Sequence, residues 1–112
     1  MPHVHRLTIE PVRVTPAEAV LLVRVELDGP AEGVELRGAL VGPRCPGVST
    51  VEIAYPLRPT AGDSGLSLMA VIPEPNLWSA AAPFRYDGRV EVWAGGTRAE
   101  VREFAVELRA AS

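Results

Sequence analysis

The chain has few of the residues that mark disulfide-bonded, membrane or metal-dependent proteins. Among its 112 residues there is one cysteine and no lysine, and aromatic residues make up 5% of the sequence. A single cysteine, Cys45, excludes an internal disulfide. No apolar run approaches the roughly 20 residues that a membrane helix needs, and the first residues lack the apolar core of a signal peptide. We therefore expect a cytoplasmic protein without a membrane partner.

Charge gives no sign of a nucleic-acid partner either. The net charge is −3, and the 11 basic residues, all arginine, are spread along the chain with acidic residues between them. A protein that binds phosphate backbones usually gathers its cations into a patch or stripe. The sequence therefore predicts that no nucleic acid is bound.

The residues that are abundant indicate a compact β-domain. Hydrophobic residues make up 47% of the chain, and the 11 prolines and 10 glycines suit many short strands and turns. A chain of this length is one domain, residues 1–112, with enough buried surface for its own core.

Apolar and polar residues alternate in seven stretches, and none repeats with helical period. Residues 42–47 and 58–65 are predicted to be loops. The predicted strands are 5–14, 19–27, 34–40, 51–57, 66–72, 84–93 and 97–109. This pattern is typical of an all-β, immunoglobulin-like antiparallel β-sandwich of about seven strands.

Prolines, glycines and breaks in the alternation predict local features of these strands. Pro11 predicts a kink at which the first strand passes from one sheet to the other. Pro56 predicts an edge position for the fourth strand. Gly95 and Gly96 suit a two-residue hairpin turn, and the change of phase in the last strand predicts a β-bulge near 102–103.

The segment 73–86 is the longest stretch without strand alternation that still carries large apolar side chains. Its prolines restrict the backbone, and exposing a large apolar side chain costs about 1.5–3 kcal/mol. We therefore expect a packed plug that closes one end of the sandwich, built from Leu77, Trp78, Pro83 and Tyr86. The Tyr86 hydroxyl is expected to bond a nearby backbone group.

Two parts of this segment, Pro75-Asn76-Leu77-Trp78-Ser79 and Pro83-Phe84-Arg85-Tyr86, carry a resemblance to a known family. They resemble the signature P-x-L-W-S-x-x-x-P-x-L-Y of the immunoglobulin-like β-sandwich domain of glycoside hydrolase family 2, which includes β-galactosidases, β-glucuronidases and β-mannosidases. Arg85 stands where the family prefers leucine. In that family the catalytic glutamates lie in a separate (β/α)₈ barrel of about 250 residues, which cannot fit here. The resemblance therefore implies a stand-alone, non-catalytic domain.

Arg89, Glu91 and Trp93 share the outward phase of the sixth strand. Arginine beside tryptophan is typical of interface hot spots. These residues are the candidate surface for a protein partner or for self-association. The alternative is a tryptophan shielded by a neighbouring strand or by arginine side chains. Trp78 has an alternative of its own, stacking on a sugar ring.

Other reactive residues do not form a recognisable set. His3 and His5 are spaced so that both rings would lie on one side of a strand, where they could share a metal, but no third ligand is evident. Cys45 would be reactive only if exposed, beside Arg44. We expect neither a metal, a cofactor nor catalytic residues.

The sequence thus predicts a non-catalytic interaction module. It binds a protein partner, or a second copy, through an outer sheet face. The alternative, drawn from the resemblance alone, is an accessory carbohydrate-related module.

Overall fold

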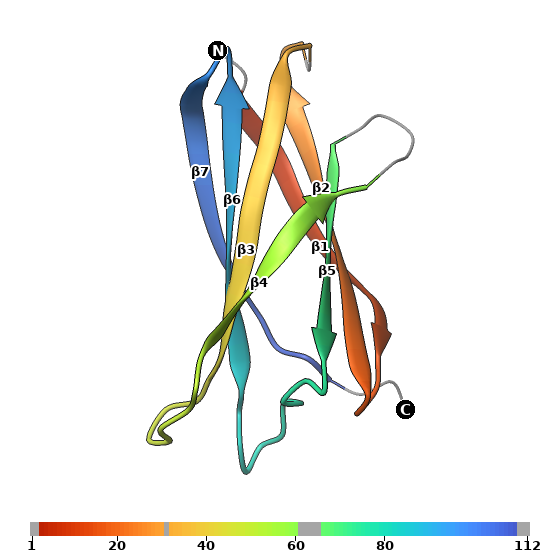
Figure 1. The fold of residues 1–112 in the computed structure, drawn as a ribbon, viewed down its shortest axis with the longest axis vertical. Helices are drawn as coiled ribbons and strands as arrows, with labels where there is room; N and C mark the ends of the chain where they lie inside the picture. The colour runs from red at the N-terminus through yellow and green to blue at the C-terminus, as the bar shows by residue number, and fades with distance from the viewer. Residues whose placement is uncertain (1–2, 31, 61–65, 110–112) are drawn as a thin grey trace.

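The computed structural model describes residues 3–30, 32–60 and 66–109, and these form seven strands without a helix (Figure 1). The strands are β1 (His3–Val14), β2 (Glu18–Asp28), β3 (Val34–Arg44), β4 (Ile53–Pro59), β5 (Ser67–Pro73), β6 (Arg85–Ala94) and β7 (Thr97–Val106). Every paired strand is antiparallel to its neighbour. The predicted all-β class is therefore confirmed. Within the described ranges no helix is long and apolar enough to cross a membrane.

The strands follow the order β1-β2-β5-β4-β3-β6-β7 in a nearly closed sheet. One layer contains β1, β2 and β5, and the other contains β3, β6 and β7. Strand β4 joins the layers, because it pairs with β3 from Ile53 to Leu57 and with β5 only at Arg58 and Pro59. Figure 1 shows β4 running obliquely across from β3 to β5. The result is a sandwich whose two layers are continuous through one strand.

The strand that changes layer is β4, whereas the sequence predicted the first strand. Strand β1 stays paired with β2 along its length. The prediction of an edge position for Pro56 was also wrong, since β4 has neighbours on both sides. Pro56 nevertheless lies where only β3 is paired with β4. A residue without an N–H is tolerated there, because the strand has a single hydrogen-bonded neighbour.

Proline in β1 produces a bulge rather than a change of sheet. The register with β2 shifts between Pro11 and Arg13. The extra residue, Val12, is 57% exposed, whereas Val14 returns to the core. Regular alternation would place Val12 and Val14 on the same side of the strand, but a bulged residue drops out of the alternation.

The core forms from the inward phase of the strands, as the alternation predicted for 19–27, 66–72 and 84–93. No charged or polar side chain is buried among the described residues. The buried apolar side chains are Val4, Val14, Ala19, Leu21, Val23, Val25, Leu36, Leu40, Cys45, Leu57, Leu68, Ala70, Ile72, Tyr86, Val90, Val92 and Leu108.

Strands β3 and β4 differ in length from their predictions. Strand β3 continues to Arg44, into the stretch predicted as a loop. Strand β4 begins only at Ile53, so Val51 is 83% exposed rather than paired and inward. Ile53 itself is 50% exposed. Both residues lie at the end of the sheet, where no facing layer covers them. Most of the predicted loop 58–65 lies outside the described residues.

The last hairpin has the predicted turn but a different bulge. Gly95 and Gly96 have φ angles of 59° and 78°, as a two-residue turn requires. The extra residue in β7 is Ala99, because Val92 pairs with Glu100 while Trp93 pairs with Arg98. The predicted bulge near 102–103 is therefore wrong.

This bulge turns Glu100 and Arg102 toward the inner side of the sheet. Glu100 accepts a hydrogen bond from the Val4 N–H at 3.0 Å, and Arg102 donates to the Val4 carbonyl at 3.1 Å. The two side chains thus clasp the edge strand β1 to the other edge strand, β7. Burial raises the pKa of the Glu100 carboxyl, but the bonds from Val4 and Arg102 outweigh it and hold the pKa below its ordinary value. Inward charges on an edge strand also discourage pairing with another chain.

Candidate partner surface

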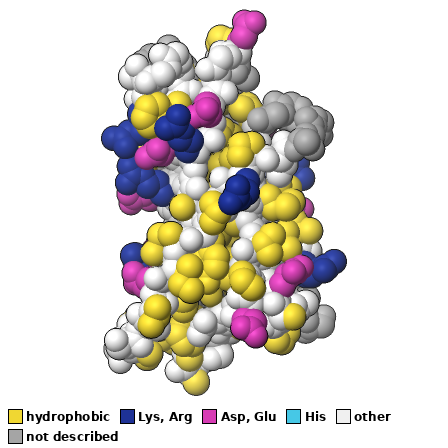
Figure 2. All heavy atoms as spheres, in the orientation of Figure 1, with side chains coloured by type: hydrophobic (Ala, Val, Ile, Leu, Met, Phe, Trp, Pro, Cys, Tyr) yellow, Lys and Arg dark blue, Asp and Glu magenta, His cyan; other side chains and the backbone are white. Residues whose placement is uncertain are grey.

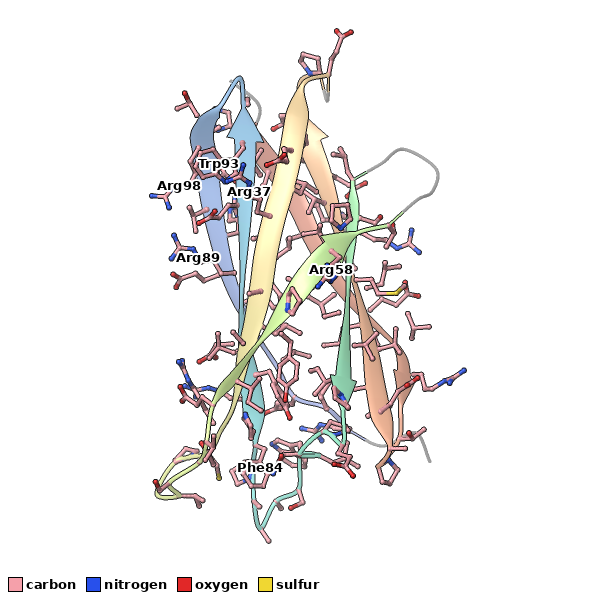
Figure 3. All side chains as sticks on the ribbon, in the orientation of Figure 1. Arg37, Arg58, Phe84, Arg89, Trp93 and Arg98 are labelled. Carbon is pink, nitrogen blue, oxygen red and sulfur yellow. The ribbon has the colours of Figure 1, made fainter. Side chains whose placement is uncertain are left out.

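Trp93 lies near the end of β6 on the outer face of the β3-β6-β7 layer. Figure 3 shows Arg37, Arg89 and Arg98 gathered around it, from β3, β6 and β7. The register explains this, because Glu91 pairs with Arg37 across β3 and Trp93 pairs with Arg98 across β7. We call Arg37, Arg89, Glu91, Trp93 and Arg98 the Trp93 surface.

Glu91 holds the Trp93 surface together. It accepts a hydrogen bond from Trp93 Nε1 at 3.0 Å and another from Arg98 at 3.3 Å. Arg89 is 3.2 Å from the same carboxylate. The Arg37 guanidinium carbon lies 4.3 Å from the centre of the Trp93 rings, a cation–π contact. The indole is therefore half-buried and fixed in orientation, with a cation against the ring system.

The environment of Glu91 leads to a prediction. The hydrogen bond from Trp93, followed by those of the arginines, lowers the pKa of the Glu91 carboxyl below its ordinary value despite some burial. In Trp93→Phe, which lacks the N–H, we expect the Glu91 pKa to move back upward, as followed by NMR titration of the carboxyl carbon. Trp78→Phe is the matched control and should leave this pKa unchanged. An unshifted Glu91 pKa in Trp93→Phe would show that the indole bond is not formed in solution.

A shallow groove of about 790 Å³ adjoins the Trp93 surface and shares three of its residues, Arg37, Arg89 and Glu91. Ala39 and Ala105 are among its outward-facing lining residues, and their short side chains leave the hollow. Glu103, Arg44 and Asp87 complete the charged lining. Volumes of this order are typical of ligand sites. Half of the residues that line the groove are charged, however, which suits a chain segment with charged side chains better than a wholly apolar small molecule.

The plug residues lie at the end of the sandwich where β5 crosses to β6 (Figure 1). Tyr86 is buried and its hydroxyl accepts a hydrogen bond from the Asn76 N–H at 2.9 Å, the expected bond to a backbone group. Leu77 packs against the core, and Pro83 is half-buried. Trp78 is also half-buried, and its backbone N–H donates a hydrogen bond to the Leu108 carbonyl at 2.7 Å. The crossover is thus tied both to β6 and to the segment after β7.

Trp78 carries a cation against its rings as Trp93 does. The Arg109 guanidinium carbon lies 3.7 Å from the ring centre. A sugar that stacked on that side of the indole would have to displace the arginine.

The structure does not bring His3, His5 and Cys45 into a common site. His3 contacts Glu100 on β7, whereas His5 contacts Asp28 on β2. A register shift between Val4 and Arg6 makes His5 an extra residue and removes the regular spacing that would let both rings share a metal. Over the described residues no three potential ligands form a metal-binding group. Cys45 is 8% exposed, so the exposure on which its reactivity depended is missing.

The sequence predicted a shared face for Arg89, Glu91 and Trp93 but did not indicate that Arg37 and Arg98 lie beside them. The first three share one strand, where alternation shows that they face the same side. Arg37 and Arg98 join them only through the registers with β3 and β7. The arginines that are dispersed along the sequence are therefore partly gathered in space.

Comparison with known proteins gives the same architecture. No protein-family model and no curated protein sequence matches the chain. A glycosyl hydrolase family 2 member from Bacteroides cellulosilyticus matches 96% of this chain with a TM-score of 0.61 and 12% identity. Bifidobacterium dentium β-glucuronidase, in a complex with coumarin-3-O-glucuronide, matches 96% with a TM-score of 0.56 and 12% identity.

The chain spans 15% and 18% of the lengths of these two proteins. The match covers an accessory β-domain and not the catalytic barrel. The predicted resemblance to the immunoglobulin-like domain of this enzyme family is therefore confirmed for the fold.

Proposed function

We propose that this protein is an interaction module whose Trp93 surface binds a protein segment that carries acidic side chains. The observation behind the proposal is the arrangement around Trp93, an indole held by Glu91 and surrounded by three arginines from three strands. Tryptophan and arginine are the residues most enriched among interface hot spots.

Charge favours an acidic partner over a second copy at this surface. Arg89 and Arg98 share the Glu91 carboxylate, and Arg37 pairs with Glu35. A second copy of the Trp93 surface would bring arginines against arginines. Carboxylates on a partner would complete the arginine hydrogen bonds with the bidentate geometry that guanidinium favours.

The test is retention of a specific partner by the immobilised protein, from a lysate of its source, with the retained protein identified and then purified. We expect Trp93→Ala to weaken binding of that protein at least about tenfold, the size of a moderate hot spot. Arg37→Ala should weaken it as well, and binding should fall as salt is raised.

The matched control is Arg24→Ala. Arg24 is as exposed as Arg37 but lies on the β1-β2-β5 layer. If Trp93→Ala and Arg37→Ala bind the partner as the wild type does, the proposal is wrong.

The likeness to parts of two glycoside hydrolases supports a second candidate, an accessory carbohydrate-related module. The probes are neutral monosaccharides and glucuronic acid, added while tryptophan fluorescence is followed. A saturable shift that Trp93→Phe or Trp78→Phe abolishes would favour this candidate. We expect no shift, because each indole already has an arginine against its rings.

A further inference from the structure

The outer face of the other layer carries an apolar stretch in the middle of β2 and β5, with charged residues beside it. Strand alternation buries Leu21, Val23, Leu68 and Ala70, so their neighbours in β2 and β5 point outward. These neighbours are Val20, Leu22, Met69 and Val71, and Val71 is 51% exposed. Figure 3 places Arg58 in the middle of the view, and Figure 2 shows hydrophobic side chains gathered beside and below the arginine there. A contiguous apolar patch of this kind marks an interaction site.

The two edges of this apolar stretch carry opposite charges, so that the face is complementary in charge to the same face of a second copy of the chain. Glu10 pairs with Leu22, Leu22 with Met69, and Met69 with Arg58, so one row crosses four strands. The row has an acid at one end, two apolar side chains in the middle and a base at the other end. With strands about 4.8 Å apart, the two charges are separated by roughly 14 Å.

We infer that this face is the interface of a symmetric homodimer. A two-fold axis parallel to the strands, midway between β2 and β5, reverses the order of the row. It brings Arg58 of each copy opposite Glu10 of the other, and Met69 opposite Leu22. The next row places Val71 opposite Val20, because these two residues are paired within one chain. Eight apolar side chains then lie between two ion pairs, as a self-complementary interface requires.

The contacts within one chain leave these charges available. Arg58 forms no ion pair with any of the described residues. Glu10 contacts Arg24 at 3.3 Å, but both side chains are about half exposed, so the pair is weak. The face is separate from the Trp93 surface, and the inference does not depend on the proposed function.

Sedimentation equilibrium of the full chain at up to about 100 μM tests the dimer, a range that detects micromolar association. We expect the wild type to dimerise and Met69→Glu to sediment as a monomer. The circular dichroism spectrum of Met69→Glu should match that of the wild type, which would show that the variant is folded. Trp93→Ala, on the opposite layer, should dimerise as the wild type does. A monomeric wild type, or a Met69→Glu variant that dimerises unchanged, would overturn the inference.

Charge reversal tests the orientation of the two copies. Arg58→Glu alone and Glu10→Arg alone should each raise the dissociation constant at least about tenfold, because like charges then face each other. The double variant Glu10→Arg with Arg58→Glu restores opposite charges and should recover most of the affinity. Double and single variants that are equally weak would contradict the proposed axis.

Discussion

Replacing Tyr86 by alanine is expected to lower the free energy of unfolding by about 3–5 kcal/mol, as for other large aromatic residues in a core. Tyr86 is 1% exposed. Its ring makes an edge contact with Tyr55, with centres 6.2 Å apart and planes at 66°. The hydroxyl holds Asn76, in the crossover from β5 to β6. The substitution therefore removes core volume and releases the crossover together. Urea unfolding followed by circular dichroism measures the loss.

Tyr86→Phe separates the two contributions. It keeps the ring but leaves the Asn76 N–H without its acceptor, which should cost about 1–3 kcal/mol. If Tyr86→Phe lost as much unfolding free energy as Tyr86→Ala, the packing of the ring would contribute nothing to stability beyond the hydrogen bond of its hydroxyl. If it were as stable as the wild type, the bond to Asn76 would have no energetic role.

The same side chain gives the stability a dependence on alkaline pH. Burial raises the pKa of Tyr86 above its ordinary value of about 10, with Tyr55 adding to the rise and the Asn76 bond opposing it. A phenol with a raised pKa in the folded state stabilises the fold below the unfolded pKa. That stabilisation is lost as the pH rises through the folded pKa. Above about pH 10 the wild type should therefore lose stability more steeply than Tyr86→Phe.

Gly88→Ala is expected to destabilise the protein by about 1–3 kcal/mol, the usual cost of overpacking. Gly88 lies opposite Phe104 across β6 and β7. A Cβ atom at Gly88 would overlap with the Phe104 ring, which covers the glycine. The ring would have to leave its place, and its contacts with the core would be lost with it.

The matched background for this test is Phe104→Ala. There the space above residue 88 is empty, so adding Gly88→Ala should cost little or even stabilise the strand. A double-mutant cycle by urea unfolding should give a coupling of at least about 1 kcal/mol. Additive effects would mean that the ring does not lie over Gly88 in solution.

Much of the fold could be predicted because alternation is a local property of each strand. Residues 19–27 and 84–93 alternate clearly, and the structure buries their inward residues except Leu27 and Phe84 at the ends, which are half-buried. Strand β7 is ambiguous, because Ala99 and Val101 give one apolar phase and the later residues another. The sequence favoured apolar residues facing inward throughout. The structure instead turns Glu100 and Arg102 inward, since the peptide of Val4 on β1 satisfies them.

What sequence could not predict depends on contacts between distant strands. The change of layer in β4 follows from pairing with both β3 and β5, and Pro56 alone does not specify it. The Trp93 surface shows the same limit. Its three residues on β6 follow from alternation, whereas Arg37 and Arg98 depend on register, which a single strand does not reveal.

The clasp on Val4 has a mechanical consequence. The start of β1 and the segment that follows β7 lie at opposite ends of a body 44 Å long (Figure 1). Tension applied between these ends would run nearly parallel to the strands, across hydrogen bonds that lie perpendicular to them. The bonds of β1 to β2 and the side-chain clasp to β7 would then be sheared together rather than peeled one after another. A domain loaded in this way resists extension until those bonds break together.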